Sequence, residues 1–417
     1  MPLKGNNNKF FEIGILLNVL GVSISIIAKE LLRNDSSMIT NIILILSVVL
    51  IVDWNSVFIN PYMKKTFDIG MIVFLQCYIV VSAIFVSAPL FHSSNALVYT
   101  LYVIAFLFAI ETNHRLIDEK FLIRAFLIVS AALNVLALGI ILKEGGSLVD
   151  LNRNVVELKG GAERSTLSGV PFYYIISFIA CSDRVKKKKI WWLFLAISLI
   201  NLFACNRRTV YVTILVCICV FYMKKMSRIK GEEIRKNRVL KVVIGFVSLI
   251  AVTKILLSIP QVSAMVQSSL DSLLRGLRTF FSDEYGDASV LVRNRSRQVA
   301  KEYFGSNSLL QWIFGRGYAF LWFDFPFAEA FLDLGIVQGL IYMYLFLILP
   351  ISTIIKEKKM GSIQLLFTFG MISAMLSSFS SGMPYGYTKY CPLILFVHFV
   401  VQDSKSFYEN AEDVYVD

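Results

Sequence analysis

The 417-residue chain is poor in the residues that build soluble catalytic centres. Only 17% of its residues are charged, against about 25% in a typical soluble domain. It has three widely separated histidines, and its six cysteines lie in or at the ends of apolar runs with no CxxC pair. These scarcities argue against a disulfide framework and a Cys/His metal centre. We therefore expect small buried cysteines, no metal and no cofactor.

Apolar residues dominate instead, at 56% of the chain, and the mean hydropathy is +0.67. Repeated apolar runs near the length that crosses a bilayer predict an all-α, polytopic helical membrane protein with about twelve spans. A membrane β-barrel is excluded because the runs do not alternate between apolar and polar residues. The expected spans lie near 10–30, 38–59, 67–90, 96–111, 121–142, 165–182, 190–205, 209–223, 240–259, 328–355, 363–380 and 387–402.

The net charge of +12 is spread over the connections between alternate apolar runs, with dense groups at 184–189 and 224–241. Such an alternation is typical of cytoplasmic loops, and it argues against a nucleic-acid partner. Both termini are then expected in the cytoplasm. The first run is too long for a cleavable signal and lacks a small-residue cleavage site, so it is expected to remain as an anchor.

The predicted organisation has four parts. Residues 1–259 hold spans one to nine, 260–327 form one large loop on the non-cytoplasmic face, 328–402 hold the last three spans, and 403–417 form an acidic cytoplasmic tail. We see no internal repeat. The polar loop is expected to carry the chemistry, because it interrupts an otherwise apolar sequence.

Three arginines outside the large loop fall on the predicted outer side. Arg164 opens span six, and Arg207 and Arg208 occupy a very tight turn between spans seven and eight. A cation at helix-centre depth costs about 2.5–3.5 kcal/mol, and less near the interface. Two adjacent arginines at the membrane boundary therefore favour an anionic partner. Alternatively, both side chains extend to lipid phosphates.

The loop contains a predicted helix over 287–303 with a cationic stripe. Arg293, Arg297 and Lys301 are spaced four residues apart and share one face, while Val299 lies on another. Arginine binds phosphate through two parallel hydrogen bonds and stays charged. The stripe therefore predicts a diphosphate-binding surface, or alternatively a helix that rests on anionic headgroups.

Two further features follow the predicted helix. Trp312 precedes a Gly-Arg-Gly turn centred on Arg316, where glycines allow close backbone approach to a ligand. Asp324 and Glu329 come next, and Pro326 is suited to a helix start. Asp333 lies four residues after Glu329, so the two acids share a helix face; the helix dipole offers an alternative reason for acids in a first turn.

These pieces, in this order, resemble the O-antigen polymerase and ligase superfamily of bacterial envelope proteins. The resemblance covers most of the chain as architecture. It is more specific at the segment from Arg164 to Pro171, at the turn 206–208, at the arginines 293–297, and in the glycine turn 315–317 followed by 332–339. Ligase-type members place a His-Asn-like pair before the last motif. Residues 324–330 contain no histidine, which favours a repeat-unit polymerase.

The resemblance implies glycosyl transfer on the outer face of the cytoplasmic membrane. Undecaprenyl-diphosphate-linked repeat units would be joined into O-antigen or capsular polysaccharide, with membrane lipid and a chain-length regulator as further candidate partners. The expected catalytic residues are Glu329, Asp324, Arg293 and Arg208. The expected diphosphate- or glycan-binding residues are Arg164, Arg207, Arg297, Arg316 and Trp312.

Two other functions stay open. A ligase of the same superfamily would transfer finished glycan to lipid A core or another acceptor. A polysaccharide flippase would also have about twelve spans, but it would normally show two related halves and no dominant outer loop.

Overall fold

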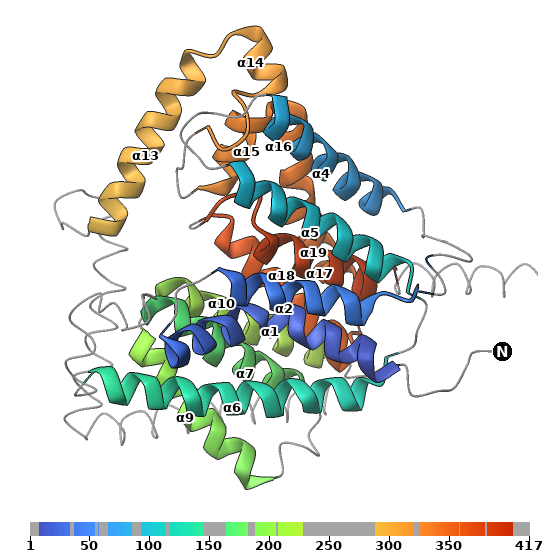
Figure 1. The fold of residues 1–417 in the computed structure, drawn as a ribbon, viewed down its shortest axis with the longest axis vertical. Coiled ribbons are helices and arrows are strands. Elements are labelled where there is room, and N and C mark those ends of the chain that lie inside the picture. Colours follow the sequence, from blue (N-terminus) through green and yellow to red (C-terminus); the bar gives the residue numbers. More distant parts are fainter. Residues whose placement is uncertain are drawn as a thin grey trace, which may run out of the picture.

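The computed structural model describes most of the chain (Figure 1). The described residues are 8–33, 37–54, 57, 66–85, 93–113, 117–145, 164–181, 188–205, 207–227, 288–320, 325–357, 359–379 and 382–402. Within these ranges every regular element is a helix, and there is no strand. The all-α prediction is therefore confirmed for the part of the chain that the structure describes.

The helices pack into one bundle. Its first half comprises α1 (Asn8–Leu32), α2 (Met38–Ile51), α4 (Phe67–Phe85), α5 (Ser93–Glu111), α6 (Glu119–Gly145), α7 (Gly169–Ala180) with the preceding 3-10 turn η2 (Arg164–Ser168), α9 (Lys189–Cys205) and α10 (Arg208–Ser227). The second half comprises α13 (Ala288–Gly305), α14 (Leu309–Phe314), α15 (Pro326–Leu334), α16 (Ile336–Met343), η4 (Tyr344–Ile348), α17 (Leu349–Lys356), α18 (Ser362–Ser377), α19 (Tyr387–Phe396) and η5 (Val397–Gln402).

Four of these helical segments are long and apolar enough to cross a membrane. They are Lys9–Leu32, Phe67–Phe85, Glu119–Lys143 and Ile336–Lys356. Shorter apolar helices occupy Met38–Ile51, Leu97–Glu111, Thr166–Ala180, Lys189–Cys205 and Ser362–Ser377. A helical membrane protein accounts for these lengths and compositions. Span nine, expected at 240–259, lies outside the described residues.

Helix ends that the sequence assigns to the cytoplasmic side meet one another in the fold. The Asp118 amide, before α6, donates a 2.5 Å hydrogen bond to Glu12 near the start of α1. His398 Nδ1 lies 3.0 Å from the carboxylate of Glu111, which ends α5. The same side holds the contacts of Asn113 with Ile51 and of Lys224 with Ile354 and Glu357. Helix ends that the sequence assigns to one side are therefore in contact with one another.

The apolar run expected as span ten, 328–355, does not form one continuous helix. It breaks at Gly335, whose φ of +88° ends α15 and begins α16. L-residues avoid this left-handed region, so the glycine permits the break. The candidate span therefore begins at Ile336, and the acids of α15 lie before it.

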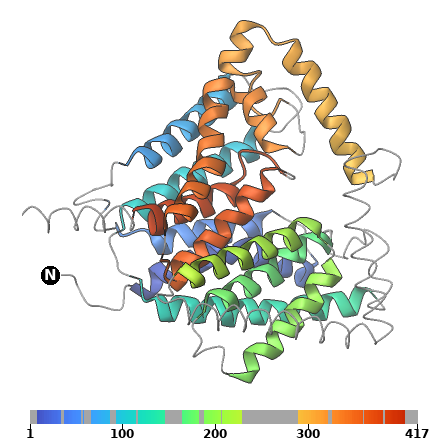
Figure 2. The ribbon, with the colours of Figure 1, turned by 180° about the vertical axis from the view of Figure 1, so that it is seen from behind.

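The described part of the large loop forms an arm. Helix α13 runs along one flank of the bundle, and α14 turns back beside α15, α16 and α4, as both ribbon views show (Figures 1 and 2). The sequence-based helix over 287–303 is confirmed with small boundary shifts, because α13 spans Ala288–Gly305. Pro326 occupies the first turn of α15, as expected.

Candidate functional site

The arm is fixed to α15 by two glycines that bring their backbones into contact. Gly315 and Gly335 both have positive φ, +79° and +88°. A β-carbon on Gly315 would lie 2.1 Å from the Asp333 carbonyl oxygen, and one on Gly335 would lie 2.1 Å from that of Ile313. No side chain fits at either position. The close approach that the Gly-Arg-Gly turn was expected to offer to a ligand is therefore made to the chain itself.

Two backbone hydrogen bonds complete this junction. The Arg316 amide donates to the Leu332 carbonyl at 2.8 Å, and the Gly317 amide donates to the Asp333 carbonyl at 3.0 Å. They satisfy carbonyls in the last turn of α15, which have no partner within the helix. The glycine turn and the segment 332–339, which the resemblance treats as successive motifs, therefore form one structural unit.

The Arg316 side chain closes the end of α13 rather than facing open space. Its Nε donates to Asn307 Oδ1 at 2.5 Å, and its Nη2 donates to the Tyr303 carbonyl at 3.0 Å and to Ser306 Oγ at 2.8 Å. The guanidinium also stacks over the rings of Tyr303 and Phe320, with centroids 4.8 and 5.3 Å away. A cation is favourable at a helix C-terminus. These contacts assign Arg316 a structural role within the arm.

Helix α13 packs through its apolar face. Val299 and Tyr303 lie against a small core formed by Ala300 and Leu332. Lys301 is exposed, as is Arg295 on another face. The backbones of Arg293 and Arg297 lie in the helix as expected, but their side chains fall outside the described residues. Trp312 on α14 stacks against Phe304 with a centroid distance of 5.6 Å and stays partly exposed.

A buried acid and two tyrosines lie beneath this junction. Asp333 Oδ2 accepts a 2.5 Å hydrogen bond from the hydroxyl of Tyr385, which stands in the connection between α18 and α19. The ring of Tyr318, from the end of the glycine turn, lies over that of Tyr385 at 4.3 Å. All three side chains are buried. Segments more than 60 residues apart in sequence are thus held together around one carboxyl group.

Burial raises the pKa of Asp333 well above the usual aspartate range, because the charged form loses hydration. The Tyr385 hydrogen bond opposes this rise, the nearby charge of Glu329 adds to it, and the amides of Phe320 and Ala319 lower it. Burial and the charge of Asp333 also raise the pKa of Tyr385 and of Tyr318. The Tyr385 hydroxyl therefore keeps its proton and remains a donor.

Glu329 lies one turn before Asp333 on α15 and is 1% exposed. The shared face expected for the two acids is confirmed, because both side chains are buried and lie one turn apart on α15. Ionised carboxylates are rarely buried without a functional or compensating reason. Coupled buried acids are typical of sites that transfer protons, although structural networks also produce them.

Lys389 is a functional candidate that the sequence analysis missed. It lies in the first turn of α19, is 4% exposed, and its ammonium lies 3.4 Å from Ser377 Oγ on α18. Gly382 lies beside the ammonium, since a β-carbon there would be in van der Waals contact with it at 3.6 Å. The available signal was a lone lysine at the start of the twelfth apolar run, since ionisable residues inside membrane helices mark function by default.

Arg207 and Arg208 sit where the sequence places them, in the turn between α9 and α10, and both are half-buried. Arg208 begins α10. Arg164 begins the 3-10 turn before α7, but its side chain falls outside the described residues, and Asp324 lies outside them entirely. The described structure therefore unites Glu329 with Asp333, Tyr385 and the glycine turn.

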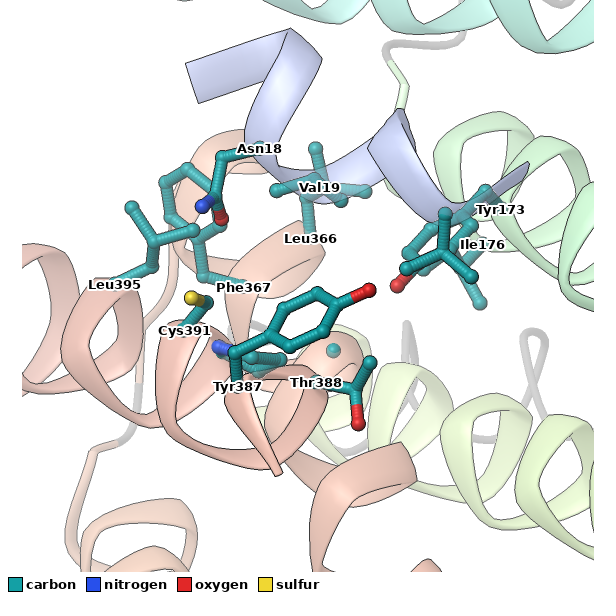
Figure 3. Close-up of a pocket in the computed structure, with 13 residues that line it drawn as sticks. Asn18, Val19, Tyr173, Ile176, Leu366, Phe367, Tyr387, Thr388, Cys391 and Leu395 are labelled. Carbon is teal, nitrogen blue, oxygen red and sulfur yellow. The ribbon is translucent and has the colours of Figure 1, made fainter. Parts of the chain in front are cut away.

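A separate pocket opens between α1, α7, α18 and α19 (Figure 3). It is small, with a cavity volume of about 50 Å³, and its lining is mainly apolar. Tyr387 extends across it toward Tyr173, and Asn18 and Thr388 supply further polar groups. Tyr387 and Thr388 belong to the same turn of α19 as Lys389. The pocket thus reaches the helix that carries the buried lysine.

Comparisons with known proteins do not assign the chain to a family. No family model, no curated protein and no solved structure matches the chain.

Proposed function

We propose that the protein is a bacterial cytoplasmic-membrane enzyme that polymerises lipid-linked oligosaccharide repeat units into O-antigen or capsular polysaccharide. The donor is a glycan on undecaprenyl diphosphate, and the acceptor is the next lipid-linked repeat unit. The reaction takes place on the outer face, with both chain termini in the cytoplasm. The resemblance to the polymerase and ligase superfamily supplies this hypothesis, and the fold offers groups that suit it.

The buried carboxyl pair on α15 is the observation that carries the proposal. Glu329 and Asp333 lie just before the candidate span Ile336–Lys356, directly beneath the attachment of the polar arm. Acids at this point can meet a sugar that arrives from the outer side while its lipid remains in the bilayer. A purely structural arm needs no second buried carboxyl, and burying one costs free energy.

The proposed reaction joins an acceptor hydroxyl to the anomeric carbon of the donor. The new C–O bond forms as the bond to the diphosphate oxygen breaks, and the hydroxyl proton passes to a carboxylate. We assign the proton acceptor to Glu329 or Asp324, since a positioned base contributes typically ~10²–10⁴-fold to rate. Asp333, which accepts the Tyr385 hydrogen bond, lies one turn after Glu329 on the same helix.

Charge develops on the lipid diphosphate as it leaves. Preorganised guanidinium groups stabilise such charge, and each is typically worth a few kcal/mol when aimed at the developing anion. Arg207, Arg208, Arg293 and Arg297 are the proposed groups, with Arg164 as a further one. Arg316 stays a binding candidate, and its Nε and Nη2 also hold the end of α13.

The apolar pocket supports a lipid-linked substrate. Its lining is mainly aliphatic and aromatic, with polar groups from Asn18, Tyr387 and Thr388 on different walls. A short part of a prenyl chain would find apolar surface there, because no charged residue lines the pocket. This assignment explains why an enzyme acting on a water-soluble sugar would be built inside a helical bundle.

A glycan banding assay tests the proposal in a strain that lacks the gene. Wild type should restore a ladder, while Glu329→Gln and Arg293→Ala should leave a single repeat unit on its acceptor. Matched controls on the exposed faces of α13, Glu302→Gln and Arg295→Ala, should keep the ladder.

Other patterns would replace the proposal. Repeat units trapped on the cytoplasmic side after deletion would indicate a flippase. A ladder that persists on the lipid carrier but never reaches its final acceptor would indicate a ligase.

A further inference from the structure

Helix α14, at the tip of the arm, exposes an unusual amount of apolar surface. Leu309 is 76% exposed, Leu310 67%, Phe314 57%, Ile313 39% and Trp312 38%. The remaining residue of this helix is a glutamine used in its cap. A segment of a water-exposed loop would normally be polar, because large contiguous apolar patches on soluble surfaces mark contact with something else.

Several polar backbone groups at both ends of α14 are hydrogen-bonded within the protein. At its start the Gln311 amide donates to Ser308 Oγ at 3.3 Å and the Ser308 amide donates to Gln311 Oε1 at 2.9 Å, which is a capping box. At its end the Gly315 amide donates to the Gln311 carbonyl at 2.9 Å, and the Tyr78 hydroxyl donates to the Phe314 carbonyl at 2.7 Å. A helix surrounded by lipid requires this internal satisfaction.

The contact with Tyr78 places α14 against the side of a candidate membrane span. Tyr78 lies seven residues before Phe85, the end of α4, which is about 10 Å along a helix axis at 1.5 Å per residue. Phe74, Tyr78, Val81 and Phe85 share one stripe of α4, and the three apolar members are 36% exposed or more. The arm therefore touches α4 well inside its length.

The exposed surface of α14 continues onto the neighbouring span as well. Ile336, Val337 and Leu340 form an exposed face of α16, and α14 packs beside α16 and α15. In Figure 1, α14 lies at the upper edge of the helix stack beside α4 and α16, whereas α13 begins farther toward one end of the stack. The apolar patch is thus an extension of surfaces that belong to membrane-crossing helices.

We infer that α14 is embedded in the outer leaflet of the bilayer and that lipid acyl chains cover Leu309, Leu310 and Phe314. The arm then has a polar helix, α13, at the membrane surface and an apolar tip that enters the hydrocarbon. A protein partner would have to cover the lipid-facing stripes of α4 and α16 together with α14, whereas lipid already surrounds those spans. The inference requires the membrane location but not the proposed enzymatic activity.

Spin-label accessibility tests this placement in the full-length protein reconstituted into phosphatidylcholine–phosphatidylglycerol vesicles. The labels are attached at Leu310→Cys and, as a control from the polar helix, at Glu302→Cys; both parent positions are exposed. The native cysteines are replaced by serine in both variants, and each preparation is checked for a monodisperse chromatographic profile. Relaxation by oxygen, which concentrates in lipid, is compared with relaxation by a water-soluble nickel complex.

The expected result is a reversal between the two sites. The label at position 310 should relax at least several-fold more with oxygen than with nickel, and the label at 302 should show the opposite preference. A nickel preference at both positions would overturn the inference and place α14 in water. Low accessibility to both reagents at 310 would also overturn it, because a second copy or another protein would then cover the helix. None of these outcomes depends on sugar transfer.

Discussion

The hydrogen bond between Tyr385 and Asp333 makes the most specific energetic prediction. Both side chains are buried, at 4% and 1% exposure, and the oxygen atoms lie 2.5 Å apart. Tyr385→Phe removes the only atom that donates this bond and leaves the ring in place. A hydrogen bond to an ionised group is worth about 1.5–3 kcal/mol, and one between neutral groups about 1 kcal/mol.

The stability lost in Tyr385→Phe should increase as the pH rises. Burial raises the folded-state pKa of Asp333 above its unfolded value, so the stability contributed by the neutral acid is present at low pH and is lost as pH rises through the raised pKa. Tyr385→Phe raises that pKa further, because the bond stabilises the charged form. The variant should therefore lose about 1 kcal/mol at a low pH where Asp333 is neutral, and about 1.5–3 kcal/mol at a higher pH where Asp333 is ionised.

Reversible unfolding in mixed detergent micelles measures this loss of unfolding free energy. Tyr385→Phe is compared with wild type, both alone and in combination with Asp333→Asn. The coupling energy between the two substitutions should be at least about 1 kcal/mol at the higher pH, since the residues are in contact. If Tyr385→Phe lost the same stability at both pH values and showed no coupling with Asp333→Asn, the hydrogen bond would not contribute as described. Tyr385 would then act only through ring packing on Tyr318.

Further predictions concern the arm and the pocket. Gly315→Ala should detach the arm and speed proteolysis between α13 and α15, while Gly305→Ala should not, because nothing lies within 4 Å of its added carbon. Arg316→Lys should loosen the end of α13 in hydrogen exchange, since an ammonium cannot reproduce the three hydrogen bonds. Gly370→Ala should narrow the apolar pocket and lower polymer yield without lowering the amount of folded protein, because the added carbon meets only Pro392 at 3.9 Å.

The helices were predictable because their signals are local. Long apolar runs, the periodicity of 287–303 and the proline at 326 each fix a segment from its own residues. The break at Gly335 was not predictable. The apolar pattern passes through it unchanged, and the break depends on the Ile313 carbonyl, which occupies the space of a side chain. Only a contact between distant segments reveals that requirement.

The site was predictable in part for the same reason. Helical spacing placed Glu329 and Asp333 on one face. The structure adds that both side chains are buried. Tyr385 joined them from a connection that looked merely uncharged, because tyrosine carries no sequence signal for the carboxyl it will meet. Arg316 was assigned to a ligand since it stood between two glycines, whereas its partners lie in the end of α13.

Reconstituted polymerisation tests the central proposal most directly. The purified protein in vesicles is given a single lipid-linked repeat unit as both donor and acceptor, and the products are separated by size. The account predicts lipid-linked oligomers of increasing length with wild type, and none with Glu329→Gln at an equal amount of folded protein. Repeat units that stay monomeric with the wild-type protein, whether or not they cross the bilayer, would contradict it.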